Sequence, residues 1–350
     1  MMSDLSSRFS KDCLAASTNA DVRAALRGQR IAVTGGSGFL GSWLAEMVAA
    51  LNDEYLLGMT LDLYSRGAAD WAKANTRLST RGDIHTVVQD VRSPFAFHPD
   101  TTYVVHAAGI PDNRVHASDP LRVFQTTVQG TTHALDAATQ LSGLKRLVNL
   151  SSSLVNGTPD RTGAIAETDN FPVPAGQLHN VYRDAKHAAE SLCATYRSQF
   201  RLPVSTLRPF TFLGPYQELD RPWAINNFMR DMLLGSEIRM HSDGSARRSY
   251  LYGSDAAWWT LSALVQGVDG QIYNLGSAEP VSHLDLIKLI ERAANKTANC
   301  VFGNVQTERK TQDDLYPDLG KSHKSLHVEQ TCSLEQAVGK TYQWYFRKSA

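Results

Sequence analysis

A tyrosine and a lysine four residues apart form the pair in this sequence best suited to moving a proton. The segment "NVYRDAK", residues 180–186, contains Tyr182 and Lys186. Residues four apart share one face of a helix, so the two side chains can approach a common ligand. A free tyrosine has a pKa of about 10, and a nearby ammonium favours the phenolate. Lowering that pKa by about three units takes roughly 4 kcal/mol, so the pair could supply a general base near neutral pH.

The spacing alone also occurs on solvated helix faces, so a second motif is needed. The turn "VTGGSGFLGS", residues 33–42, follows an apolar strand and begins a helix. Glycines permit a tight turn and let a pyrophosphate approach backbone N–H groups at the helix N-terminus. The strand and helix context predicts a dinucleotide site rather than an empty turn. Its expected contacts are Gly35, Ser37, Gly38, Phe39, Leu40 and Gly41.

The end of the second strand decides between NAD and NADP, and the sequence leaves two alternatives. In the NAD form an acidic residue at this strand end binds the ribose 2′-OH. If the strand in "TLDLYSRG" stops at Leu61, Asp62 is that acid and NAD is favoured. If it runs to Tyr64, Ser65 and Arg66 face the ribose and suit a 2′-phosphate. Ser65 and Arg66 lead us to favour NADP slightly.

Strand-like and helical patterns alternate along the chain. Buried-strand runs occur at residues 30–36, 59–65, 84–91, 102–109, 146–153 and 203–210, separated by helical patterns. This alternation predicts an α/β fold with a doubly wound parallel sheet of the Rossmann type. We expect a helical extension over residues 1–28 and a dinucleotide-binding domain over 29–208. Residues 209–350 would mainly form a smaller α/β substrate-binding domain, with segments near 250–275 returning to the first domain.

Composition excludes several classes of function. Lys plus Arg and Asp plus Glu both number 35, so no net field draws the chain to nucleic acid or to a membrane surface. No stretch is apolar enough for a signal peptide or a membrane span, which favours a cytoplasmic enzyme. The cysteines lack the spacing of a metal site, so no metal is expected. They are Cys13, Cys193, Cys300 and Cys332.

Eight ordered motifs resemble those of the extended short-chain dehydrogenase/reductase family, in its nucleotide-sugar epimerase and dehydratase branch. The resemblance runs from about residue 29 to the C-terminus. The matching segments are Thr34 to Gly41, Asp90-Val91, His106-Ala107-Ala108, the serines of "LVNLSSS", Tyr182-x-x-x-Lys186 with Glu190, Arg208 to Pro215, Gly244 to Tyr250, and Asn274 to Gly276.

The resemblance implies a role for each matching residue. Tyr182 would exchange a proton with a sugar hydroxyl, and Lys186 would hold the nicotinamide ribose and lower the tyrosine pKa. Ser152 would assist, with Ser151 and Ser153 as fallbacks because Asn156 replaces the usual tyrosine of that strand. Further cofactor contacts would be Asp90, Val91, Ala107, Ala108 and Pro209. The substrate, a nucleoside-diphosphate sugar, would touch Ser153, Thr211, Asn227 and Arg248. The resemblance also implies that the chain forms a homodimer.

The same resemblance favours one reaction. Dehydratases and sugar-acid decarboxylases carry acidic residues where this chain has Leu154, which cannot move a proton. Epimerisation needs fewer catalytic groups from the protein, so a C4 epimerase is the preferred interpretation. Glu218 stands where uronate epimerases have a carboxylate-binding arginine, although Arg221 or Arg230 could compensate. Alternatives are an NADPH-dependent keto-sugar reductase, a dehydratase or decarboxylase with non-standard acid and base residues, and a non-enzymatic dinucleotide sensor. His106 is expected to be a core histidine.

Overall fold

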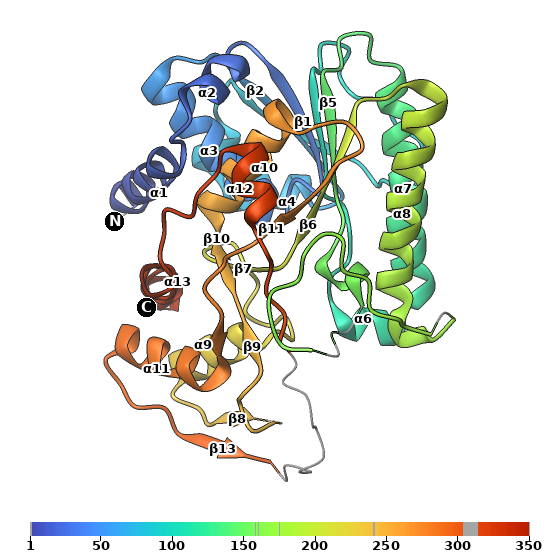
Figure 1. Ribbon diagram of the computed structural model, residues 1–350. Helices are drawn as coiled ribbons and strands as arrows, with labels where there is room; N and C mark the ends of the chain where they lie inside the picture. Colours follow the sequence, from blue (N-terminus) through green and yellow to red (C-terminus); the bar gives the residue numbers. More distant parts are fainter. Residues whose placement is uncertain are drawn as a thin grey trace.

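A parallel seven-stranded sheet forms the centre of the molecule (Figure 1). The computed structural model describes residues 2–157, 159, 161–174, 176–240, 242–303 and 314–349. For residues 2–7 and 349 it describes the backbone alone. The strands follow the order β11-β6-β5-β4-β1-β2-β3. They are β1 Arg30–Thr34, β2 Thr60–Ser65, β3 Ile84–Val88, β4 Tyr103–His106, β5 Arg146–Leu150, β6 Val204–Pro209 and β11 Ile272–Leu275.

This strand order confirms the predicted Rossmann-type fold. The order reverses between β1 and β4, and a ligand crevice lies outside the carboxyl ends of the strands at such a point. The register pairs Val33 with Val105 and Thr34 with His106, so the turns after β1 and β4 begin at the same level. The central strand β4 is buried along its whole length, and β5 is buried after its first residue, because helices cover both faces. The ends of β1, β4, β5 and β6 therefore lie where this rule predicts the ligand site.

Helices cover the sheet on two sides (Figure 1). α7 Pro120–Thr139 packs along α8 Val181–Phe200 on one side, and α3 Phe39–Tyr55 packs along α10 Gly253–Gln266 on the other. The sequence pattern gives α3 one apolar face, yet α3 is buried from Leu40 through Asn52. The reason is that α1 Met2–Ala16 covers the side of α3 that α10 leaves open.

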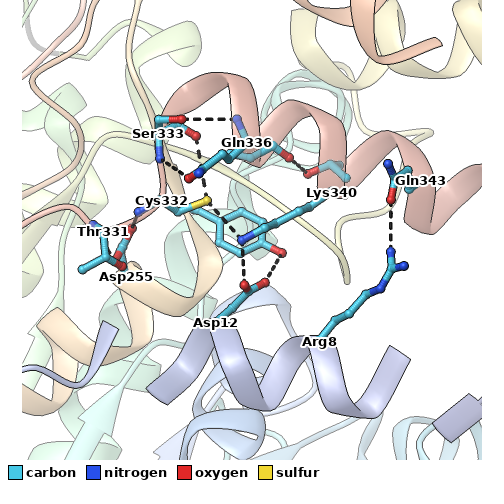
Figure 2. A network of polar contacts seen from close by, with 12 residues as sticks. Arg8, Asp12, Asp255, Thr331, Cys332, Ser333, Gln336, Lys340 and Gln343 are labelled. Atoms are coloured by element: carbon cyan, nitrogen blue, oxygen red, sulfur yellow. Dashed lines mark hydrogen bonds and ion pairs between the residues drawn. The ribbon is translucent and has the colours of Figure 1, made fainter. Parts of the chain in front are cut away.

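The N-terminal helix α1 is bound to the C-terminal helix α13 Leu334–Ser349 (Figure 2). Asp12 accepts hydrogen bonds from Lys340 Nζ at 2.6 Å and from the Tyr252 hydroxyl at 3.2 Å. Phe9 lies between Trp43 of α3 and Trp344 of α13, with ring centroids 5.3 and 5.1 Å away. The first helix therefore joins the helix of the glycine turn to the end of the chain.

Short strand pairs build the smaller region, which also contains α9 Ala224–Leu234 and α11 His283–Ala294. β7 Thr211–Leu213 pairs with β10 Tyr250–Tyr252, β9 Arg247–Arg248 with β12 Val281–Ser282, and β8 Ile238–Met240 with β13 Cys300–Phe302. The sequence predicts a loop over residues 241–252, of which His241 lies outside the described residues. The structure instead has β9 and β10 there, because their partner strands come from distant parts of the sequence.

The remaining elements are short. They are α2 Ala20–Leu26, α4 Ala68–Ala74, α5 Thr76–Ser79, α6 Asn113–Ser118, α12 Gly320–Leu326, and the 3-10 turns η1 Ser153–Asn156 and η2 Leu178–Asn180. Among the described residues, no helix has the length and apolar character needed to cross a bilayer. The same residues contain no group of three or more His, Cys, Asp or Glu side chains arranged to hold a metal ion.

Candidate active site and dinucleotide site

Close backbone packing explains the glycines of the turn after β1. Gly35 has φ +73°, and a Cβ there would lie 2.8 Å from the carbonyl oxygen of Ala107. At Gly36 a Cβ would lie 2.7 Å from Leu63 Cβ, and at Gly41 it would lie 2.2 Å from the Gly36 oxygen. The turn therefore folds tightly against β2 and β4, as the sequence motif requires.

The start of α3 can accept an anion. Gly38 is the N-cap residue and supplies no side-chain hydrogen bond to the first turn. The first N–H groups of a helix lack intrahelical partners and carry a partial positive charge. Because the glycines leave this end open to close approach, the turn fits the diphosphate of a dinucleotide. Phe39 lies beside it, stacked on Phe212 of β7 at 5.6 Å between centroids.

The second strand passes Tyr64 and ends at Ser65, so the alternative in which it stops at Leu61 is wrong. Asp62 lies inside β2, buried, and accepts two hydrogen bonds from Arg30 at 2.7 and 2.8 Å. Its carboxylate is committed to that ion pair. Ser65 Oγ lies 2.5 Å from Ser37 Oγ of the glycine turn, and Arg66 is exposed at the strand end.

Asp90 and Val91 lie beyond β3 at the same edge. Hydrogen bonds from Arg92 lower the pKa of Asp90 to about 2. Arg66 also lowers the pKa of Asp90, so the two side chains lie in one electrostatic neighbourhood. Val91 is buried against Gly130 of α7, where a Cβ would come within 2.8 Å of Val91 Cγ2. Asp90 is thus a fixed negative charge beside the cofactor edge.

Tyr182 and Ser152 meet at the end of β5. Tyr182 is the second residue of α8 and is buried, with 9% of its surface exposed. Burial raises the pKa of Tyr182 to about 12, while a hydrogen bond with the Ser152 side chain acts in the opposite direction. Ser152 also caps η1 by accepting the Leu154 N–H at 3.2 Å. Of the three serines considered from the sequence, Ser152 is the one whose side chain acts on the pKa of the phenol.

Lys186 lies one helical turn further along, facing β5. It is 3% exposed, and its ammonium donates to the carbonyl of Leu150 at 2.6 Å. Burial lowers the pKa of Lys186 to about 8, while the charge of Glu190 raises it. The ammonium lies 5.8 Å from the centroid of the Tyr182 ring. The sequence predicts that this charge lowers the pKa of Tyr182, whereas in the structure burial is the largest influence on that pKa and raises it.

His116 of α6 stacks on Tyr182, a contact that sequence reasoning missed. The two ring centroids are 4.8 Å apart, and the planes differ by 12°. No motif singles out His116, because the contact joins two elements far apart in the sequence. His106, by contrast, is the expected core histidine. It hydrogen-bonds Thr34 and Thr131 at 2.8 and 3.2 Å, and burial lowers its pKa to about 3.

A largely buried ion pair joins α8 to the sheet. Arg208 of β6 donates to both carboxylate oxygens of Glu190 at 3.0 and 2.9 Å. Its third contact is the Glu167 carbonyl at 2.8 Å. The Glu167 carboxylate accepts the backbone N–H of Asn274 in β11 at 2.8 Å. The motifs that contain Glu190, Arg208 and Asn274 therefore belong to one hydrogen-bond network that joins α8, β6 and β11.

The predicted substrate residues lie on several different elements. Ser153 is buried at the start of η1, and Thr211 is half-buried in β7 opposite Tyr250. Asn227 is half-buried in α9. Arg248, in β9, donates to the Arg247 carbonyl at 3.0 Å. The neighbouring residue Arg247 forms an ion pair with the buried carboxylate of Asp314.

The arrangement occurs in a known family of proteins. A family model described as "NAD dependent epimerase/dehydratase family" matches residues 31–276, which contain the glycine turn, Tyr182, Lys186 and all seven strands of the sheet. The chain belongs to the NAD-dependent epimerase/dehydratase family. It is accordingly an enzyme of the extended short-chain dehydrogenase/reductase branch, as the sequence predicts.

Relatives of this family member include decarboxylases and epimerases of nucleotide sugars. The UDP-N-acetyl-alpha-D-glucosaminuronate decarboxylase of Bacillus cytotoxicus is 27% identical over 328 residues, covering 91% of this chain and 98% of the relative. UDP-glucuronic acid decarboxylase 2 of Arabidopsis thaliana is 27% identical, covering 89% and 67%. The UDP-glucuronic acid 4-epimerase of Bacillus cereus, solved with UDP-glucuronic acid and NAD, is 25% identical with a TM-score of 0.77, covering 92% and 100%.

Asn156 marks a departure from the usual pattern of the family. It replaces the tyrosine expected in the segment after β5 and is buried. Its side-chain amide donates to the carbonyls of Ala166 and Asp169 at 3.1 and 2.8 Å. Asn156 therefore fastens the loop that follows η1, a structural use of the position.

Replacing Gly41 with alanine tests the dinucleotide site. The new Cβ would collide with the Gly36 carbonyl, so the turn must open and the helix N-terminus must shift. We expect Gly41→Ala to weaken dinucleotide binding by at least about tenfold, the loss of roughly 1.4 kcal/mol. Calorimetric titration with NAD and NADP measures this. Gly143→Ala is the matched control, because a Cβ there meets nothing within 4 Å. Unchanged affinity in Gly41→Ala would contradict the site.

Proposed function

We propose that this enzyme is a nucleotide-sugar C4 epimerase. The observation that carries the proposal is the buried constellation of Tyr182, Ser152 and Lys186 with Leu154 beside it. The glycine turn would hold the diphosphate of a nicotinamide dinucleotide, and this cofactor would supply a reversible hydride acceptor for the sugar carbon. The protein itself would then have to transfer one proton and allow the keto sugar to rotate in the site.

Tyr182 would take the proton of the C4 hydroxyl and later give it back. Its hydrogen bond with Ser152 favours the phenolate, and the ammonium of Lys186 is the nearby positive charge. With its pKa lowered to about 8, Lys186 remains mostly protonated at neutral pH. A tyrosine with a pKa raised by burial returns a proton readily, which suits a reversible transfer.

Elimination and decarboxylation are disfavoured by the residues near Tyr182. Leu154, 43% exposed, stands where the dehydratases and decarboxylases of the family have an acidic residue. The carboxylates of Glu167, Glu190 and Asp169 are already bonded to Asn274, Arg208 and Arg161. Each of these three carboxylates would have to leave its present partner before it could transfer a proton in either reaction.

The charges around the substrate crevice favour a sugar without a carboxylate. Glu218 is exposed and lies 2.7 Å from Arg221. Arg221 also donates to the buried Asp112 at 3.1 Å, and Arg230 is paired with Asp231 at 2.9 Å. Both arginines that could bind a uronate are therefore occupied by protein carboxylates. A neutral hexose or acetamido sugar on a nucleoside diphosphate fits these charges better.

The edge of the cofactor site supports NADP. Asp62 is held inside β2 by Arg30, so its carboxylate is not at the strand end that faces a ribose. Ser65 and the exposed Arg66 stand there instead, and an arginine accommodates a 2′-phosphate. The same observation favours a second function, an NADPH-dependent keto-sugar reductase. A reductase would consume NADPH in proportion to product, whereas an epimerase causes no net change in absorbance near 340 nm.

A homodimer is the assembly we propose. Leu121 and Phe124 of α7 and Phe200 of α8 are exposed apolar side chains on the two helices that pack together at the outer face (Figure 1). Covering them would remove apolar surface from water.

Tyr182→Phe tests the proton-transfer role. Without the hydroxyl, the proton of the sugar has no acceptor, so turnover should fall by at least about a thousandfold, in the range of a lost general acid–base. Dinucleotide affinity should stay within about twofold, because the ring remains. Kinetics with nucleoside-diphosphate hexoses and calorimetry measure the two quantities. Retained turnover would refute the assignment.

Arg66→Ala tests the cofactor preference separately. Removing the guanidinium should weaken NADP binding by about tenfold or more, the value of one charge-assisted contact to phosphate. NAD affinity should change less than about twofold. Lys73→Ala, an exposed cation on the nearby α4, is the control. An equal effect on both dinucleotides would argue against a 2′-phosphate contact.

A further inference from the structure

The imidazole of His116 covers one face of the Tyr182 ring. The rings are nearly parallel, with centroids 4.8 Å apart and an interplanar angle of 12°. His116 Nε2 lies 2.7 Å from the carbonyl oxygen of Ile110. Since a carbonyl only accepts, Nε2 carries a hydrogen, and this bond fixes the tilt of the imidazole. An offset stack of this kind stabilises the relative orientation of two rings.

The helix that carries His116 is itself held in place. Asp112 caps α6 by accepting the backbone N–H of Arg114 at 3.0 Å, and its carboxylate is 3% exposed. Arg221, from the loop after β7, donates to the same carboxylate at 3.1 Å. A six-residue helix would otherwise be loosely placed. The cap and the arginine therefore keep His116 over the tyrosine.

The other surroundings of Tyr182 explain why this cover matters. Ile110 and Val123 pack against its ring as a small apolar cluster, and Lys186 lies 5.8 Å from its centroid. These contacts come from the loop after β4 and from α7 and α8, whereas His116 comes from α6. Removing the imidazole would leave one ring face without support, and the phenol could swing away from Ser152.

We propose that His116 is a positioning residue, which holds the Tyr182 phenol in the orientation that transfers the proton. This inference rests on the proposed function, because it assigns a part in the same proton transfer. His116 acts through Tyr182, and a flat ring of similar size should replace it.

His116→Ala and His116→Phe test the proposal together. Misplacing a reacting group by about an ångström costs as much as a hundredfold, so His116→Ala should lower kcat at least about tenfold. KM for the nucleotide sugar and Kd for the dinucleotide should stay within about twofold, since neither touches the imidazole in this account. His116→Phe keeps a stacked ring and should restore kcat to within about threefold of the wild type. His85→Ala, an exposed histidine on β3, is the control.

A second readout does not depend on turnover. In protein labelled with ¹³C at tyrosine ring carbons, the Tyr182 signal is assigned by its loss in Tyr182→Phe. The stacked ring should shift this signal, and His116→Ala should remove the shift while His116→Phe keeps it.

Unchanged kcat in His116→Ala, or equal losses in the alanine and phenylalanine variants, would overturn the proposal. If the wild type interconverts no nucleotide sugar, the proposed function fails instead, and the tyrosine signal still decides whether His116 fixes the phenol.

Discussion

A buried ammonium at the carboxyl end of β5 is the constraint on which the site depends. A cation taken out of water costs free energy unless a hydrogen-bonding partner replaces the lost solvent. For Lys186 that partner is the Leu150 carbonyl at 2.6 Å, the last residue of β5. The bond fixes α8 against β5 in one register.

Three successive turns of α8 then face the strand ends. Tyr182 meets Ser152, Lys186 meets Leu150, and Glu190 pairs with Arg208 of β6. Residues four apart lie on the same face, so one helix orientation satisfies all three. Arg208 is buried, so breaking its pair with Glu190 is costly because it would leave that charge uncompensated. Structural and chemical roles are therefore combined along a single helix face.

Local signals in the sequence predict much of this arrangement. The strand patterns and the glycine turn predict the parallel sheet, and the spacing of Tyr182 and Lys186 predicts their shared face, because each depends on neighbouring residues. Contacts between distant segments leave no such signal. The stack of His116 on Tyr182, the docking of α1 on α3, and the Arg221 bond to Asp112 all join segments far apart in the chain. The depth of Asp62 in β2 also needed the structure, because strand ends are poorly defined by sequence.

The fate of the hydrogen on the sugar carbon tests the central claim most directly. The enzyme would be incubated with nucleoside-diphosphate hexoses carrying deuterium at C4, and the products examined by NMR and mass spectrometry. A C4 epimerase should form both C4 epimers, and both should retain the deuterium at C4, because the same hydrogen leaves and returns. Deuterium accumulating on free dinucleotide, or a product that has lost water or carbon dioxide, would contradict it.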